Sequence, residues 1–231
     1  MKTNIIAEIG INHFGKLKLL EKYVESFNGL GIDGISIQIL SKKKTLKKFK
    51  NYSLKKNEIK KFVNIAKKKF KFVGVAIHSW DDFKFLSTLN IDFVKILSKS
   101  FGNIDYFKNV KSANVKKIYL STGGKTDIEI FKLLKKVNLK NLTLIYTFFK
   151  TQNFKKSLMN ISLMKKKFKV PIAYGNHFDK IDQIYKVCDY QPSDIFFYIK
   201  MNKKLNYPDN KHAIPLKKIS LILKKIRNGK I

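Results

Sequence analysis

Eight short apolar runs recur along the sequence, and each is followed by a stretch with helical periodicity. The runs are Asn4–Gly10, Gly34–Ile39, Phe72–His78, Phe93–Leu97, Lys117–Thr122, Leu142–Phe148, Val170–Asn176 and Ile195–Lys200. Near-continuous apolar strands that alternate with amphipathic helices are typical of a parallel sheet covered by helices. Eight such units in 231 residues predict an α/β fold, a single-domain (β/α)8 TIM barrel over residues 1–231, with a doubly wound open sheet as the alternative.

The helices expected from the periodicity fill the gaps between the runs and follow the last one. They are Leu17–Phe27, Leu54–Lys69, Asp81–Leu89, Ile104–Val110, Asp127–Val137, Lys155–Lys166, Phe178–Val187 and Leu216–Ile226. The lysine-dense segment Ser41–Asn57 lacks this periodicity, so we expect an exposed connection there. Thr126 followed by Glu129 predicts a capping box at the start of the fifth helix. No linker rich in Pro, Gly or Ser divides the chain, which favours one domain.

The charge of the chain is strongly positive, +33 in total, but its composition does not favour specific nucleic-acid binding. Only Arg227 among the 49 basic residues is an arginine, whereas base and phosphate recognition relies heavily on the arginine fork. Abundant Lys, Asn, Ile, Phe and Tyr are the residues of A/T-rich codons, so genomic bias explains the charge. The alternative, a polyanion-binding protein, predicts one continuous basic face and a steep salt dependence.

Neither a membrane span nor a disulfide framework is expected. No run approaches the roughly 18 apolar residues of a transmembrane helix, and Glu8 interrupts the only early apolar run, so no signal peptide is predicted. The single cysteine, Cys188, excludes an internal disulfide and a cysteine-based zinc site. We therefore expect a cytoplasmic protein.

The opening stretch, residues 5–15, places a carboxylate at the end of a buried strand. Glu8 is followed by Asn12 and His13 in a loop between two glycines. A buried carboxylate is costly unless it binds a ligand or is paired, so Glu8 belongs either to a site or to a salt bridge in the core.

Polar residues stand at the carboxyl end of every run, where the loops of a TIM barrel build the active site. They are Glu8, Asn12, His13, Ser36, Gln38, His78, Ser79, Lys95, Ser98, Ser121, Thr122, Thr147, Asn176, His177, Tyr198 and Lys200. Lys95 lies inside an apolar strand, where an unpaired ammonium is costly. An anionic ligand at the barrel mouth would compensate it. The alternative is a lysine that extends to the rim.

Three further features point to ligand chemistry. The segment Ser121–Thr126 closes the fifth strand with small residues that let backbone N–H groups approach an anion, although it lacks the glycine spacing of a P-loop. His177 follows the seventh strand and is a candidate divalent-metal ligand. Asp209, in a polar turn after the eighth strand, is either a base or substrate-orienting group or simply a turn residue.

In this order, the motifs resemble the sialic acid synthase family, which makes nonulosonic acids from phosphoenolpyruvate and an amino sugar. The resemblance rests on residues 6–15 (Ile-Ala-Glu-Ile-Gly-Ile-Asn-His-Phe-Gly), Lys95-Ile96-Leu97-Ser98, Leu120-Ser121-Thr122-Gly123, Gly175-Asn176-His177 and Pro208-Asp209-Asn210-Lys211. It extends from about residue 4 to about residue 220 and implies the barrel domain alone, since 231 residues leave no room for the family's C-terminal antifreeze-like domain.

The resemblance implies a reaction and a set of roles. Carbon-3 of phosphoenolpyruvate attacks a sugar aldehyde polarised by a divalent ion, usually manganese; water then adds and phosphate leaves. Glu8 and Asp209 would be the catalytic residues, and His177 a metal ligand. The substrate-binding residues would be Gln38, Lys95, Ser98, Ser121, Thr122 and Lys200. The family also forms homodimers, which makes a second copy an expected partner beside the small-molecule substrates.

Two of the departures from the family pattern bear directly on ligand binding. Ser36 stands where the family has a lysine for phosphoenolpyruvate, and Tyr198 stands at the expected second metal-binding histidine. A phenol with a reference pKa near about 10 is a poor neutral ligand, so manganese or another divalent cation should bind more weakly. Lys200, which shares a strand face with Tyr198, is a candidate replacement cation. The sequence thus favours a divergent synthase, with a ligand-binding or regulatory barrel of the same pathway as the alternative.

Overall fold

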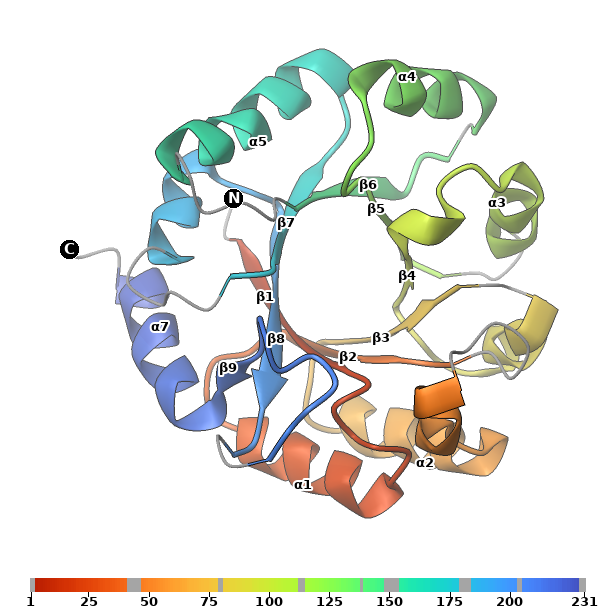
Figure 1. Cartoon of the computed structure of the whole chain (residues 1–231), viewed down its shortest axis with the longest axis vertical. Coiled ribbons are helices and arrows are strands. Elements are labelled where there is room, and N and C mark those ends of the chain that lie inside the picture. The colour runs from red at the N-terminus through yellow and green to blue at the C-terminus, as the bar shows by residue number, and fades with distance from the viewer. Residues whose placement is uncertain are drawn as a thin grey trace.

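The architecture is a closed eight-stranded parallel barrel surrounded by helices (Figure 1). The structure is a computed structural model, and it describes residues 3–40, 47–78, 81–111, 115–137, 139–147, 154–178, 184–202 and 205–228. Its barrel strands are β1 Asn4–Gly10, β2 Gly34–Gln38, β3 Phe72–Ile77, β4 Phe93–Ile96, β5 Lys117–Ser121, β6 Leu142–Tyr146, β7 Ile172–Asn176 and β8 Asp194–Lys200.

The strands pair in sequence order, and β8 then pairs with β1 in parallel, from Asn4 opposite Asp194 to Glu8 opposite Tyr198. This pairing closes the sheet and confirms the predicted TIM barrel; the doubly wound alternative is wrong. A two-residue strand that was not predicted, β9 (Ile214–Pro215), pairs with the end of β8.

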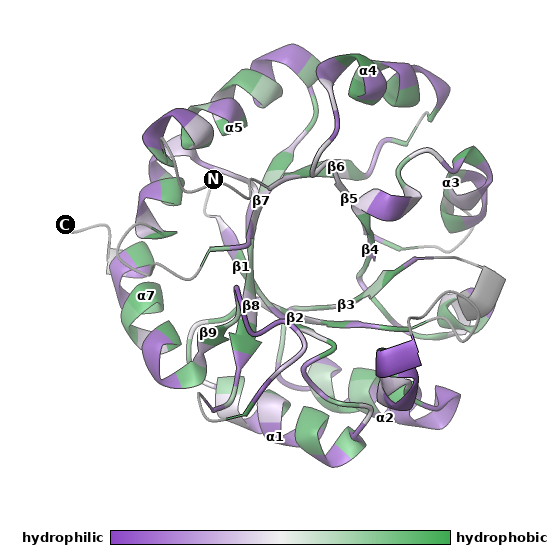
Figure 2. Cartoon of the chain, viewed as in Figure 1, coloured by the Kyte–Doolittle hydropathy of each residue, from purple (hydrophilic) through white to green (hydrophobic). Residues whose placement is uncertain are grey.

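The outer layer contains α1 Leu17–Phe27, α2 Lys56–Lys67, α3 Ile104–Lys111, α4 Asp127–Lys136, α5 Phe154–Phe168 and α7 Leu216–Asn228. In α1 the buried residues are Leu20, Tyr23, Val24 and Phe27, the spacing of one apolar face. Figure 2 shows apolar and polar residues interspersed along each helix around the ring. Thr126 and Glu129 form the predicted capping box at the start of α4.

Three expectations need correction. The predicted helix Asp81–Leu89 is a 3-10 helix over Asp81–Thr88, in which the Ser87 and Thr88 hydroxyls donate to backbone carbonyls three residues earlier. The C-terminal part of Phe178–Val187 is also 3-10, Tyr185–Tyr190, while residues 179–183 lie outside the described ranges. The segment expected to be an irregular connection contains a 3-10 helix at Lys47–Tyr52.

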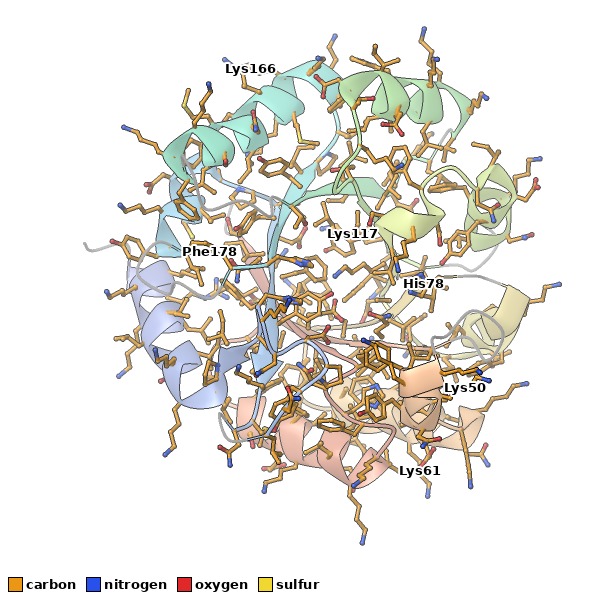
Figure 3. The ribbon with its side chains drawn as sticks, in the orientation of Figure 1. Lys50, Lys61, His78, Lys117, Lys166 and Phe178 are labelled. Carbon is orange, nitrogen blue, oxygen red and sulfur yellow. The ribbon has the colours of Figure 1, made fainter. Side chains whose placement is uncertain are left out.

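Two apolar layers position the site. One lies between the strands and the helices. The other fills the barrel with inward side chains of alternate strand residues: Ile6, Phe93, Tyr119, Ile145, Ala173 and Phe196. Figure 3 shows side chains filling the interior of the ring, whereas those of Lys50, Lys61 and Lys166 lie outside it. Because side chains alternate along a strand, the next inward residues stand one step nearer the carboxyl ends, directly above this apolar plug.

Candidate active site

A buried ion pair stands at the centre of the barrel mouth. Lys95 Nζ of β4 donates to Glu8 Oε2 of β1 at 3.0 Å, and the two residues are 3% and 0% exposed. The same ammonium lies 5.0 Å from the ring centroid of Phe196 and 5.2 Å from that of Tyr198. Lys95 is therefore compensated within the chain by Glu8 and does not extend to the rim, which corrects that alternative. Its binding of an external anion stays a prediction.

Two polar atoms beside this pair have no hydrogen-bond partner among the described residues. They are Glu8 Oε1 and Ser36 Oγ. The two residues face each other in the β1–β2 register, and both are fully buried. Unsatisfied buried polar atoms are uncommon in folded proteins and are frequently explained by a bound group.

Asp209 is held over the mouth by the loop that follows β1. The backbone N–H of Ile11 donates to Asp209 Oδ2 at 3.2 Å, and the Asp209 N–H donates to Asn12 Oδ1 at 3.1 Å. Asn12 Nδ2 in turn donates to the carbonyl of Ile199 at 3.1 Å. Gly10 makes this close approach feasible: its φ is +59°, and a Cβ there would lie 2.4 Å from Asp209 Oδ2.

The environment of Asp209 favours its protonated form. The pKa of the Asp209 carboxyl is raised to about 6, chiefly by burial and also by the nearby Glu8 charge, against the Ile11 hydrogen bond and Lys95, which lower it. A carboxyl group whose pKa is near the working pH can both donate and accept a proton. Asp209 therefore has the properties of a general acid or base.

Two histidines and a tyrosine form an aromatic cluster next to Asp209. The rings of His177 and His212 stack with centroids 4.5 Å apart and planes 23° apart, and Tyr198 meets both edge-on. Burial lowers the pKa of His177 to about 3, helped by His212 and Lys95, and lowers that of His212 to about 4, helped by Lys95 and Lys200. Both imidazoles are therefore neutral at pH 7.

The arrangement of this cluster does not fit a divalent metal. Lone pairs of imidazole lie in the ring plane, so two nearly parallel stacked rings do not aim them at a common point. Tyr198 adds a phenol whose pKa is raised well above its usual value by burial and by Glu8 and Asp209. Across the described ranges, no three His, Cys, Asp or Glu side chains are grouped so as to hold a metal ion.

The other predicted site residues are distributed around the mouth. Ser121 ends β5 half-buried, and Ser98 begins a short 3-10 helix after β4. Gln38 Nε2 lies 3.5 Å from His78 Nε2, while Ser79 falls outside the described residues. The Lys200 ammonium donates to the Asn210 carbonyl at 3.0 Å and to its side-chain oxygen, so it is held by the loop after β8.

Thr122 belongs to a different environment from Ser121. Its hydroxyl donates to the Ile145 carbonyl at 2.9 Å, and its side chain borders a cavity of about 580 Å³ between α4 and α5. This cavity also contacts Thr147, Lys125 and Lys166 and lies outside the barrel interior.

Sequence reasoning did not assign roles to Asn12, Ser36 and His212. Asn12 fixes Asp209, Ser36 faces Glu8, and His212 Nε2 lies 3.8 Å from Asp209 Oδ1. One feature of the sequence could have indicated that His212 belongs to the site: it follows Asp209 by three residues in the same polar turn. Its neighbour His177 comes from a different strand end, and nothing in the local sequence indicates that contact.

Comparisons with known proteins agree with the fold. A sialic acid synthetase from Leptospira borgpetersenii serovar Hardjo-bovis superposes with a TM-score of 0.88 at 18% identity, covering 99% of this chain and 84% of the other. The spore coat polysaccharide biosynthesis protein spsE of Bacillus subtilis superposes with a TM-score of 0.80 at 16% identity, and the match covers 98% of this chain and 68% of the other. A truncated 3-deoxy-D-arabino-heptulosonate 7-phosphate synthase from Thermotoga maritima superposes with a TM-score of 0.76 at 15% identity, and the match covers 98% of this chain and 86% of the other.

These structures establish the barrel, since identities this low carry the fold alone. A comparison of the sequence with curated proteins finds no match. In the part of the chain that the structure describes, no helix is long and apolar enough to cross a membrane. The NeuB family matches residues 35–231, which is most of the barrel although it begins after the Glu8 segment. The chain belongs to the NeuB family, the sialic acid synthase barrels.

Proposed function

We propose that this protein acts in nonulosonic acid or surface carbohydrate biosynthesis and condenses phosphoenolpyruvate with an amino sugar or a related aldehyde. Family membership supports the reaction class, and similar structures described as a sialic acid synthetase and a spore coat polysaccharide protein support the pathway. The observation that carries the proposal is the buried Glu8–Lys95 pair with Asp209 held beside it at the carboxyl ends of the strands.

The chemistry can be assigned to groups of this chain. Carbon-3 of phosphoenolpyruvate attacks the aldehyde carbon, and protonated Asp209 donates its proton to the aldehyde oxygen as that oxygen becomes negative. Water then adds to the resulting oxocarbenium, Glu8 accepts a proton from it, and phosphate leaves with C–O cleavage. An ammonium has three donors, and Lys95 uses one on Glu8. Its remaining donors, with Ser98 and Ser121, are available to the phosphoenolpyruvate anion.

No step in this scheme passes through a metal ion, because the stacked His177 and His212 rings do not fit one. Gln38 and Lys200 are proposed to contact the sugar side of the mouth, and Thr122 to support the Ser121 loop. The homodimer expected from the resemblance remains a prediction, as does a cytoplasmic location.

The test is phosphate release from phosphoenolpyruvate with a panel of amino sugars and other aldehydes, each with and without manganese. Glu8→Gln should reduce release by about 100-fold or more, the usual contribution of a general base. Glu25→Gln is the matched control, because Glu25 is an exposed carboxylate of α1 that also pairs with a lysine. Release that does not exceed the Glu8→Gln background anywhere in the panel contradicts the proposal.

One arrangement favours a second candidate, a ligand-binding or regulatory barrel without turnover. Lys95 is already compensated by Glu8, and the aromatic cluster occupies the region where the resemblance implies a metal. This candidate predicts phosphoenolpyruvate binding in calorimetry, lost in Lys95→Met, with no phosphate release. Tight manganese binding that disappears in His177→Ala would argue against it.

A further inference from the structure

The side of the mouth formed by β1 and β2 contains two buried oxygens that lack partners within the described chain. Glu8 Oε1 and Ser36 Oγ belong to residues that are each 0% exposed, and Glu8 is the register partner of Ser36. No hydrogen bond joins the two side chains. Leaving two such atoms unsatisfied in one place is costly, so a shared partner is the simplest arrangement that satisfies both.

The neighbouring strand bounds this space. At its inward positions β3 carries Gly74, opposite Ser36, and Ala76, opposite Gln38. The ring of Phe93 occupies the room beside Gly74, where a Cβ would lie 2.3 Å from it, and so closes the floor. One step nearer the mouth, Ala76 contributes only a methyl group. Lys95, the register partner of Ala76 on β4, binds Oε2, which leaves Oε1 for another donor.

The chemistry of the two oxygens selects the group that can join them. Glu8 Oε1 only accepts hydrogen bonds when ionised, whereas the Ser36 hydroxyl can donate. The Ser36 hydroxyl also accepts, so a donor-only group could bind both oxygens but would leave the Ser36 proton without an acceptor. A neutral hydroxyl group donates to Glu8 and accepts from Ser36, and so satisfies both. A phosphate or carboxylate oxygen would be repelled by the Glu8 carboxylate, and an ammonium could not accept from Ser36.

We propose that Glu8 Oε1 and Ser36 Oγ form a subsite for a single hydroxyl group, a water molecule in the resting protein. The β1–β2 side of the mouth then recognises a neutral hydroxyl, and anionic groups bind on the β4–β5 side. Displacement of this water by a sugar hydroxyl rests on the proposed function; the subsite itself does not.

The first test is a crystal structure at about 1.5 Å resolution, without ligand and after soaking with an amino sugar. We expect an ordered oxygen about 2.8 Å from both Glu8 Oε1 and Ser36 Oγ. In the ligand-free crystal this oxygen is water, and in the soaked crystal continuous density with the sugar would identify a substrate hydroxyl. Absence of an oxygen between the two atoms in the ligand-free crystal overturns the proposal. Because no turnover is needed, this outcome is independent of the phosphate-release assay.

The second test compares two deletions of a buried hydroxyl. Removing an unpartnered hydroxyl relieves a penalty. Tyr106→Phe on α3, whose buried hydroxyl has no partner among the described residues, should therefore leave Tm unchanged or raise it. Ser36→Ala should instead lower Tm by about 3 °C, because the bound hydroxyl loses its donor and Glu8 Oε1 its fixed partner. An increase in Tm in Ser36→Ala similar to that in Tyr106→Phe would overturn the proposal.

Discussion

Buried carboxylates at the two ends of the barrel differ in how completely their oxygens are hydrogen-bonded. At the amino ends of the strands, Asp92 accepts from Lys67, Lys116 and the Val73 N–H at 2.7–2.9 Å. Asp194 accepts there from Asn4, Lys117 and Ser193 at 2.8–2.9 Å. At the carboxyl ends, one oxygen of Glu8 has no partner within the described chain, and the pKa of Asp209 is raised to about 6 by burial and by Glu8.

This difference separates stability from binding within one fold. The satisfied carboxylates at the amino ends connect neighbouring strands and contribute to folding, as is usual for that face of a TIM barrel. The mouth retains polar atoms without partners among the described residues, and a carboxyl group whose charged form is disfavoured by burial, so it contributes less to the folding free energy. The predictions below test whether the two ends differ in this way.

The largest effect is expected from removing the cation at the mouth. Lys95→Met leaves the Glu8 carboxylate buried without compensation, which should lower the free energy of unfolding by about 3–5 kcal/mol. Urea denaturation measures the loss. The double variant Glu8→Gln/Lys95→Met should recover part of it, because both charges are then absent. Equal stability of Lys95→Met and the wild type would contradict a compensated buried pair.

Carboxylates at the two ends should respond oppositely to pH. Asp209 has a folded pKa of about 6 against an ordinary 3.8, so between these values the folded state binds more protons and loses stability as pH rises. Charging it costs about 3 kcal/mol. The free energy of unfolding of Asp209→Asn should therefore rise by about that much relative to wild type between pH 4 and pH 8.

Burial raises the pKa of Asp92, but hydrogen bonds from Lys67, Val73 and Lys116 outweigh this effect, so the pKa of Asp92 is lowered overall. Asp92 thus contributes stability that is present above the unfolded pKa and is lost as pH falls through its lower folded value. Asp92→Asn should be less stable than wild type at pH 7, with the difference shrinking in acid. Urea denaturation measures the free energy of unfolding of each variant and of the wild type at each pH. The difference between them removes the contributions of groups that the substitution does not affect. Parallel pH profiles for the two variants would show that the ends do not differ.

The smallest effect compares two glycines with positive φ. Gly10 at the mouth has a φ of +59° and Gly29, between α1 and β2, has a φ of +76°, so alanine costs about 1 kcal/mol at either from backbone strain. At Gly10 the new Cβ would lie 2.4 Å from Asp209 Oδ2 and 2.9 Å from Tyr198 Cε1, whereas nothing lies within 4 Å at Gly29. Gly10→Ala should lose about 1 kcal/mol more and shift the Asp209 NMR signals. Equal losses in the free energy of unfolding at both positions would indicate that the Asp209 side chain moves aside without cost.

Much of the fold could be predicted from the sequence, because strand and helix periodicities are local properties. The predicted runs match all eight barrel strands to within a few residues, and the polar residues at their ends include Glu8 and Lys95. Failures of prediction lie where short-range hydrogen bonds compete with the helix, as at Ser87 and Thr88. The roles of the site residues stay predictions, which the experiments above address.

By itself, the sequence determined the eight strand–helix units and the polar residues at the strand ends, because both are local patterns. Only the tertiary structure decided which of them meet. Lys95 finds Glu8 across 87 residues, and His212 stacks on His177 from a different strand end. These contacts depend on closure of β8 against β1 and on the stagger of the strands around the ring. Both are set by pairing between distant segments, and no local pattern encodes them.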